Sequence, residues 1–203
     1  PNDNIGITLF AGESFTQCPL TVDHAVLLDM IHNIKCGLIE DGTAVGMGIA
    51  NAVTRLKDSK AKSKVIILLT DGTNNKGDIS PMTAAEIAKS FGIRVYTIGV
   101  GTNGMAPYPY PVGNTVQYVS MPVEIDEKTL TQIAGTTDGN YFRATSNSKL
   151  KEVYEEIDKL EKTKLNVKEY SKRDEDYRWF ALAAFLCVLL EVLLRNSILK
   201  KIP

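Results

Sequence analysis

Apolar residues along the chain follow two spacings in turn, and these spacings predict alternating strands and helices. Short runs of apolar and β-branched residues bounded by turn residues predict strands, whereas apolar residues three or four positions apart predict amphipathic helices. Strands are expected over residues 5–10, 14–20, 64–70, 93–100 and 140–144. Helices are expected over residues 24–34, 43–56, 82–91 and 149–162, with a further helix that begins within 123–126 and carries Leu130 and Ile133.

This alternation predicts an α/β domain with a doubly wound, mostly parallel sheet and helices on both faces. The segment KVIILLT over residues 64–70 is apolar nearly throughout, which is typical of a strand covered on both faces of a parallel sheet. Gly46 and Gly48 lie in the helix expected over residues 43–56 and predict a close approach to another backbone.

The C-terminal part of the chain has a different pattern. Residues 179–194 read WFALAAFLCVLLEVLL, in which Glu191 is the one charged residue, and basic residues flank the run. With its flanks the segment is long enough to cross roughly 30 Å of hydrocarbon as a helix. A buried or docked C-terminal helix is the alternative. We therefore predict an α/β domain over residues 1–163, a charged juxtamembrane linker over 164–177, a transmembrane helix over 178–199 and a basic tail over 200–203.

Composition narrows the functional classes. The 203 residues are 44% hydrophobic and 23% charged with a net charge of −1, which is ordinary for a globular domain. Such a domain lacks the positive field that neutralises phosphates, so no nucleic-acid partner is expected. Cys18, Cys36 and Cys187 are too dispersed for a disulfide scaffold and are expected to be buried thiols, with a Cys18–Cys36 bridge as the alternative in an oxidising compartment.

Candidate chemistry lies in two loops beside strand ends and helix starts, where ligands bind in such sheets. Residues 40–43 read EDGT and residues 70–75 read TDGTNN. Their hydroxyl and carboxylate oxygens are the hard ligands that Mg²⁺ prefers. On the residues alone, Thr43 is more often a helix-start residue than a ligand, and Asp71 is more often a turn former. Glu40 and Asp41 are solvated positions that could replace a missing ligand, and Asn74 and Asn75 are expected to form the loop.

Two further segments have candidate functions. Residues 99–104 fit the spacing G-x-G-x-x-G after a strand, but the proline-rich segment that follows cannot start the helix that a dinucleotide site requires. The segment from Met105 to Tyr118 is a loop rich in Tyr and Pro and could form a binding surface or simply scaffold the loop. We find no catalytic constellation of residues.

The segments FAGESFTQCPLT, EDGTAVGMGIANAVTRLKDS, KVIILLTDGTNN and IRVYTIGVGTNGMAPYP resemble the von Willebrand factor type A (VWA) domains. They are most similar to the membrane-anchored bacterial Bat proteins linked to aerotolerance, of the BatA-like type. The resemblance implies a metal-ion-dependent adhesion site (MIDAS) for Mg²⁺ or Mn²⁺. Thr43 matches the family's second-loop threonine, and Asp71 matches its third-loop aspartate.

The chain departs from this family at its first motif. The motif Asp-x-Ser-x-Ser, which ends the family's first and central strand, does not occur in the sequence and should lie before Pro1. The resemblance therefore implies an N-terminally incomplete domain that lacks this strand and keeps two of five ligand residues. We expect a gap or re-paired edges in the sheet, metal binding by the intact protein, and weak or absent metal binding by this chain.

The leading hypothesis is a non-enzymatic, membrane-tethered interaction domain that binds a Glu or Asp of a partner protein through the cation. The resemblance implies neighbouring Bat proteins or a MoxR-type AAA+ ATPase as partners, and places the domain at the bacterial inner membrane, on the periplasmic side. A metal-independent scaffold that binds through residues 105–118 is the first alternative. A magnesium-dependent phosphohydrolase using Asp71 is the second.

Overall fold

The computed structural model describes residues 3–35, 37, 39–101, 104–112, 115–123, 125–171 and 177–197, and the chain divides into two compact units, 1–161 and 162–203. The first unit contains, in order, β1 (Ile5–Phe10), β2 (Ser14–Thr21), α1 (His24–His32), α2 (Val45–Leu56), β3 (Val65–Thr70), α3 (Pro81–Ser90), β4 (Arg94–Val100), β5 (Gly104–Val112), β6 (Thr115–Val123), α4 (Glu127–Thr136) and β7 (Tyr141–Ala144). Helix α5 (Asn147–Ser171) begins in this unit and ends in the second, which also contains α6 (Tyr177–Ser197).

A parallel sheet forms the centre of the first unit, with the strand order β3-β4-β7. Ile67 of β3 lies opposite Tyr96 of β4, and Ile98 of β4 lies opposite Phe142 of β7. Residues 95–98 of β4 have no exposed surface because strands cover both edges of β4 and helices cover both faces. This arrangement confirms the predicted α/β class with a parallel sheet.

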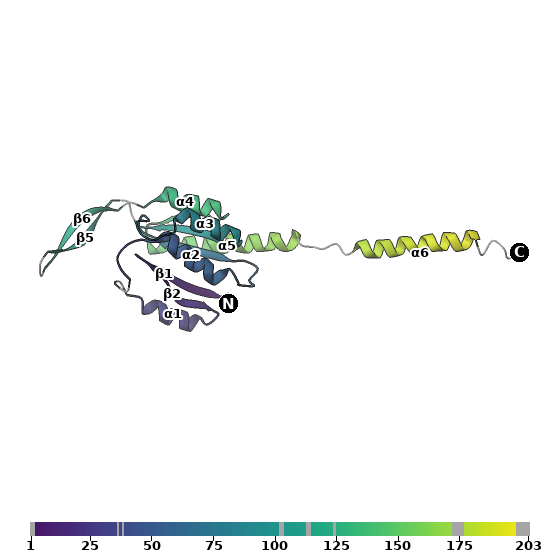
Figure 1. The fold of residues 1–203 in the computed structure, drawn as a ribbon, viewed down its shortest axis with the longest axis horizontal. Helices are drawn as coiled ribbons and strands as arrows, with labels where there is room; N and C mark the ends of the chain where they lie inside the picture. The colour runs from purple at the N-terminus through teal and green to yellow at the C-terminus, as the bar shows by residue number, and fades with distance from the viewer. Residues whose placement is uncertain are drawn as a thin grey trace. The chain divides into compact units, whose positions relative to one another are not determined.

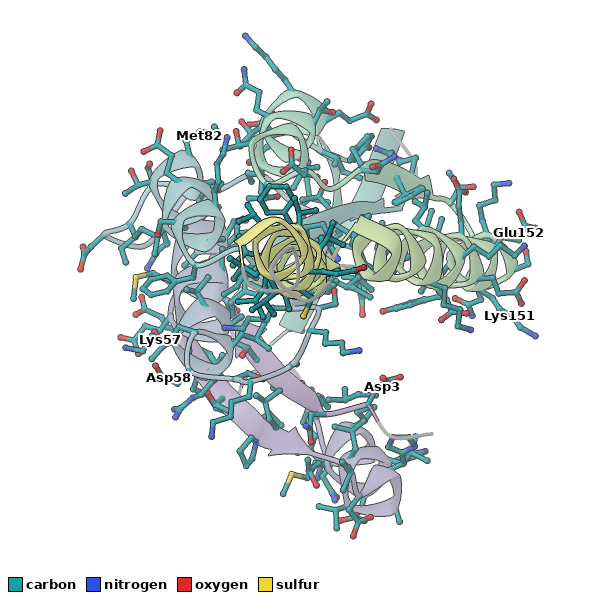
Figure 2. All side chains as sticks on the ribbon, turned by 90° about the vertical axis from the view of Figure 1, so that its right-hand side faces the viewer. Asp3, Lys57, Asp58, Met82, Lys151 and Glu152 are labelled. Atoms are coloured by element: carbon teal, nitrogen blue, oxygen red, sulfur yellow. The ribbon has the colours of Figure 1, made fainter. Side chains whose placement is uncertain are left out.

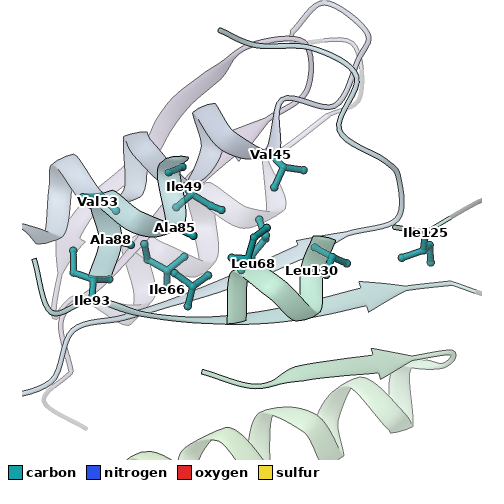
Figure 3. Close-up of a cluster of buried hydrophobic side chains, with 13 residues drawn as sticks. Val45, Ile49, Val53, Ile66, Leu68, Ala85, Ala88, Ile93, Ile125 and Leu130 are labelled. Atoms are coloured by element: carbon teal, nitrogen blue, oxygen red, sulfur yellow. The ribbon is translucent and has the colours of Figure 1, made fainter. Parts of the chain in front are cut away.

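Helices cover the two faces of this sheet unequally (Figure 1). On one face, α2, α3 and α4 bury the larger hydrophobic cluster, in which Ile49 of α2, Ala85 of α3 and Leu130 of α4 meet Leu68 of β3 (Figure 3). On the other face, Val153 and Ile157 of α5 pack with Tyr96 and Ile98. Successive residues of β4 therefore point alternately into the two clusters, as a pleated strand requires.

Helix α5 is amphipathic over the turns that pack on the sheet. Val153 and Ile157, four residues apart, are buried, whereas the intervening residues are exposed. Lys151 and Glu152 point away from the sheet (Figure 2). The helix extends beyond the predicted boundary at residue 163, so residues 164–171 of the expected linker are helical.

The N-terminal hairpin forms a separate sheet. Strands β1 and β2 pair with each other and, among the described strands, with no other, yet α2 contacts both of them as well as β3. Strand β3 is thus an edge of the described three-stranded sheet, and Val65, Ile67 and Leu69 are only half-buried. Cover of this strand on both faces was predicted from its apolar sequence, and it is incomplete on the face that packs toward α5, whereas Ile66 and Leu68 on the other face are buried.

The expected Tyr- and Pro-rich loop is instead a β-hairpin, and this prediction was wrong. Strands β5 and β6 pair antiparallel, with Pro107, Pro109 and Pro111 opposite Ser120, Tyr118 and Val116. Alternate prolines are compatible with an edge strand because all the lost N–H groups lie on one side of it. Helix α4 follows this hairpin and begins at Glu127. The Asp126 carboxylate caps it by accepting a hydrogen bond of 3.0 Å from the Thr129 backbone N–H.

The second unit contains the predicted apolar helix. The side chains at positions 181–192 of α6 are all exposed. Over the residues that the structure describes, no helix is both long and apolar enough to cross a membrane. The transmembrane segment over residues 178–199 therefore stays a prediction. Among the cysteines, Cys18 is a buried free thiol and Cys187 an exposed one, while Cys36 lies outside the described residues.

A half-buried ion pair fixes α5 to the start of β4. The Arg94 guanidinium donates to both carboxylate oxygens of Glu161, and the Tyr96 hydroxyl donates to the same carboxylate over 2.6 Å. Ser63 adds a hydrogen bond of 2.8 Å. Burial opposes the charge on Glu161, but the hydrogen bonds from Arg94, Tyr96 and Ser63 outweigh it and hold the pKa of Glu161 below its ordinary value of 4.5.

Replacing Glu161 tests this attachment. We expect Glu161→Gln to lower the free energy of unfolding at neutral pH by about 3 kcal/mol, because the substitution leaves the Arg94 charge buried and unpaired. The stabilisation requires the carboxylate form, whose pKa is depressed in the folded state, so the difference from the parent should shrink as the pH falls below 4.5. Urea denaturation at pH 7 and pH 3.5 measures both effects.

A control for this experiment lies on the same helix. Glu152 forms an exposed ion pair with Lys149, and Glu152→Gln should leave stability almost unchanged at either pH. Equal losses of unfolding free energy in the Glu161→Gln and Glu152→Gln variants would contradict the role assigned to Glu161.

Candidate functional site

The two loops that hold the predicted ligands are joined by the backbone and side chain of Asn75. The Thr43 backbone N–H donates to Asn75 Oδ1 over 2.9 Å, and the Asn75 backbone N–H donates to the Thr43 carbonyl over 3.0 Å. The Lys76 N–H donates to the same carbonyl over 3.3 Å. These reciprocal bonds fix the position of Thr43 relative to the loop that follows β3.

Thr43 lies directly against the residue that follows Asp71. A β-carbon placed on Gly72 would lie 3.3 Å from Thr43 Oγ1, so a side chain there would press against the hydroxyl. Thr70, the buried last residue of β3, accepts a hydrogen bond of 3.3 Å from the Gly72 N–H and so turns the chain at Asp71. The structure therefore brings the Thr43 hydroxyl and the Asp71 loop together at the carboxyl end of β3, the end at which ligands bind in sheets of this kind.

Asp71 is exposed beside a shallow hollow of about 220 Å³ that Leu69, Thr70, Asp71 and Val100 line. Within the described part of the chain, the Asp71 carboxylate has neither a hydrogen bond nor an ion pair. Its oxygens are thus available to a ligand that approaches the ends of β3 and β4.

The surrounding loops are predominantly acidic. Glu40 forms an exposed ion pair with Lys76 over 2.8 Å, and this hydrogen bond lowers the pKa of Glu40. The hydrogen bond from Glu40 raises the pKa of Lys76, and the charges of Asp41 and Glu13 act in the same direction. The Glu40 carboxylate is therefore paired with Lys76, and this contact gives no support to Glu40 as a replacement metal ligand.

A third loop, between β1 and β2, supports this region. The Gly12 N–H donates to the Glu40 carbonyl over 2.8 Å, and the Ala44 N–H donates to the Ala11 carbonyl over 2.7 Å. A β-carbon on Gly12 would lie 2.8 Å from the same Glu40 carbonyl oxygen, so only glycine fits here without a shift of the backbone. Three loops from different parts of the sequence thus converge next to α2.

The described residues only partly fit a divalent cation. Thr43 and Asp71 supply a hydroxyl and a carboxylate, both hard oxygen ligands, whereas Mg²⁺ takes about six oxygens. Among the described residues, no group of three or more His, Cys, Asp or Glu side chains is placed to hold a metal. The site as described is a partial one.

The model of the von Willebrand factor type A domain matches residues 1–156. The chain belongs to the VWA family. This match confirms the family inferred from the sequence, and VWA domains are typically protein-interaction modules and usually non-catalytic. The match covers all three loops of the candidate site.

Solved structures narrow the relationship. The chain is 34% identical to the conserved hypothetical protein BatB of Bacteroides thetaiotaomicron, with a TM-score of 0.68 over 80% of this chain and 81% of that one. It is 30% identical to an aerotolerance-related membrane protein of Bacteroides fragilis, with a TM-score of 0.65 over 78% and 81%. The VWA domain is thus related to the Bat proteins.

A more distant structure, proximal thread matrix protein 1 of the mussel byssus, has a zinc-occupied MIDAS motif. This chain is 26% identical to it, with a TM-score of 0.57 over 77% of this chain and 34% of the mussel protein. Among curated relatives, the chain spans between 47% and 59% of the length of the first two that it matches.

The sequence analysis missed two residues that build the site. Asn75 was predicted only to form a loop, but its side chain and backbone together hold Thr43. Gly12 lies in the short segment between the two strands predicted over residues 5–10 and 14–20, and it contacts the loop of Glu40. The chemistry of Asn was a usable signal for Asn75, because its side chain readily bonds to backbone groups of loops. Nothing in the sequence around Gly12 indicates that it contacts a loop near residue 40.

Loss of the Asn75 side chain tests the link between the two loops. We expect Asn75→Ala to raise the hydrogen-exchange rate of the Thr43 amide by roughly fivefold, because one hydrogen bond of about 1 kcal/mol is lost. Asn74→Ala is the matched control, since Asn74 is an exposed neighbour in the same loop. Similar exchange rates at Thr43 in both variants would contradict the role of Asn75.

Proposed function

We propose that this chain belongs to a membrane-tethered VWA domain that binds an acidic residue of a partner protein through a divalent cation. Thr43 and Asp71 are the two ligands that it contributes. The observation that carries this proposal is the contact between the Thr43 hydroxyl and the Asp71 loop at the carboxyl end of β3. The available Asp71 carboxylate and the acidic loops around it favour a cation at the same place.

The rest of the coordination must come from other residues. We propose that a further strand lies between β1 and β3 and brings additional hydroxyl and carboxylate ligands. Two features support this idea: α2 contacts strands of both sheets, and β3 is an end strand of the described three-stranded sheet, with half-buried apolar side chains on one face. Such a strand would join the two sheets into one and place its carboxyl end beside Asp71. We propose Mg²⁺ or Mn²⁺ as the ion, bound weakly or not at all by this chain alone.

Calorimetry with Mg²⁺ and Mn²⁺ tests the metal site. We expect no measurable binding to this chain, and binding to a chain extended by an upstream strand that carries Asp-x-Ser-x-Ser. Asp71→Ala in the extended chain should abolish binding, since it removes a charged ligand of the ion. Asp78→Ala is the control, because Asp78 is exposed in the same connecting segment and has no role in the proposed site.

The outcome separates the two candidate functions. If the extended chain binds neither ion, the metal-independent scaffold becomes the better account. That alternative has one observation in its favour, which is that Tyr118 of the β5–β6 hairpin is 72% exposed. Large exposed aromatic side chains are typical of binding surfaces.

We propose that residues 178–199 attach the domain to the bacterial inner membrane, with the domain on the periplasmic side. The supporting observation is that the described side chains of α6 are apolar apart from Glu191, and that they are exposed on several sides of the helix, including Phe185, Leu186 and Val188. An apolar helix of this kind requires cover from lipid or protein. On this proposal, partners among Bat proteins or a MoxR-type ATPase would meet the domain at the membrane.

A pair of arginine substitutions tests the membrane attachment. Val188 of α6 and Val22 of the first unit are both 59% exposed, so they lose the same share of exposed apolar surface. We expect Val188→Arg to reduce flotation with phosphatidylethanolamine–phosphatidylglycerol vesicles strongly, because arginine near the middle of a membrane helix costs about 3 kcal/mol. Val22→Arg should float like the parent chain. Equal flotation of both variants would contradict the attachment.

A further inference from the structure

The β5–β6 hairpin has two edges of opposite character. Its strands pair with each other and, among the described strands, with no other. The segment from Gly104 to Val123 contains no charged residue. Natural edge strands are commonly protected from pairing by charges or by proline. The distribution of proline therefore decides which edge of this hairpin can accept another strand.

The register fixes the direction of each backbone N–H group. In an antiparallel pair, residues alternate between pairs that exchange hydrogen bonds and pairs whose N–H and C=O groups point outward. Pro107, Pro109 and Pro111 have no N–H and occupy alternate positions, so all three belong to the outward class. Their partners Ser120, Tyr118 and Val116 belong to it as well. The residues between them carry the hydrogen bonds that hold the hairpin together.

The two outer edges of the hairpin consequently differ in the number of backbone N–H groups that they offer to another strand. Along β5, three of the four outward positions, 107, 109 and 111, are proline and offer no N–H group, and the fourth is Met105. Along β6, Val116, Tyr118 and Ser120 keep both N–H and C=O groups, and the described side chains at 118–120 are exposed. Over residues 116–120 strand β6 thus has a usable edge without proline or charge, which ends at Pro122, while β5 has a blocked edge.

We propose that the outer edge of β6 pairs antiparallel with β6 of a second copy of this chain. A two-fold axis at Tyr118 would place Tyr118 opposite its counterpart and Val116 opposite Ser120 of the other copy. This register uses all three outward N–H groups of each chain. The product is a four-stranded sheet in the order β5-β6-β6-β5.

A second copy is favoured as occupant for two reasons. The edge is uncharged, so two identical strands meet without the repulsion that charged edges would produce. The proline-blocked β5 strands lie at both outer edges of the product, so association ends at a dimer with isologous contacts and cannot continue into a fibre. An extended peptide of another protein could use the same edge, and the experiment below distinguishes the two.

Disulfide trapping tests the pairing and its register. The full chain is used in detergent micelles, at no more than one chain per micelle on average, with Cys36→Ser and Cys187→Ser. In the proposed dimer the Cα atoms of the two Tyr118 residues lie about 5.5 Å apart, which suits a disulfide. Tyr118→Cys should therefore give a covalent dimer on mild oxidation.

Gln117→Cys is the matched control. Residue 117 of one copy lies opposite 119 of the other, so the two 117 positions are roughly 8 Å apart, too far for a disulfide. Gln117→Cys alone should stay monomeric, and a mixture of Gln117→Cys and Val119→Cys chains should crosslink. Dimers in all single variants would indicate association through α6 and overturn the proposal, and so would a monomeric Tyr118→Cys chain, even if it binds an extended peptide.

Proline exchanges test the blocked edge separately. Adding Ser120→Pro to the Tyr118→Cys chain removes an outward N–H of β6 without removing a hydrogen bond of the hairpin, and should reduce the dimer at least about tenfold. Replacing Pro107, Pro109 and Pro111 by Ala opens the β5 edge and should give species larger than dimers. Neither result depends on a metal, so failure here leaves the calorimetric test of the metal site unaffected.

Discussion

The burial of β4 is the constraint on which the rest of the first unit depends. Residues 95–98 have no exposed surface, so strands must flank both edges of β4 and helices must cover both faces. Thr97 donates a hydrogen bond of 2.9 Å to the Leu130 carbonyl and so ties α4 to one face. Tyr96 and Arg94 tie α5 to the other through Glu161. A single strand thus positions four neighbouring elements.

This packing determines the geometry of the candidate site. Strand β3 is held in register against β4, so it ends at Thr70 and presents Asp71 at the carboxyl edge of the sheet. Helix α2 packs on the same core and starts just after Thr43. The loops therefore meet because the strand and the helix that carry them are packed together. The hydrogen bonds of Asn75 then set the final position of Thr43. Such a site can stay open to solvent and still be well ordered.

Sequence reasoning predicted the parallel sheet, its helices and the two loops, because hydrophobic periodicity reports burial directly. It failed where the decisive contact is distant in the chain or concerns the backbone alone. Asn75 and Gly12 are such cases, since their partners lie more than 25 positions away. The prolines of β5 suggested a loop because each one alone disfavours a strand. Because the prolines alternate at 107, 109 and 111, they are compatible with an edge strand. The strand propensity of each single residue does not reveal this pattern.

Helix α2 also affects how the chain folds during synthesis. A β-carbon on Gly46 would lie 2.0 Å from the Ile79 carbonyl, and one on Gly48 would lie 2.9 Å from the Phe10 ring. Each glycine costs a helix about 1 kcal/mol relative to alanine, and no side chain caps the start of α2. The helix therefore depends on docking, and part of its docking surface lies downstream. A ribosome must release residue 79 before α2 can become stably helical, so this segment has to wait for residues that are synthesised later.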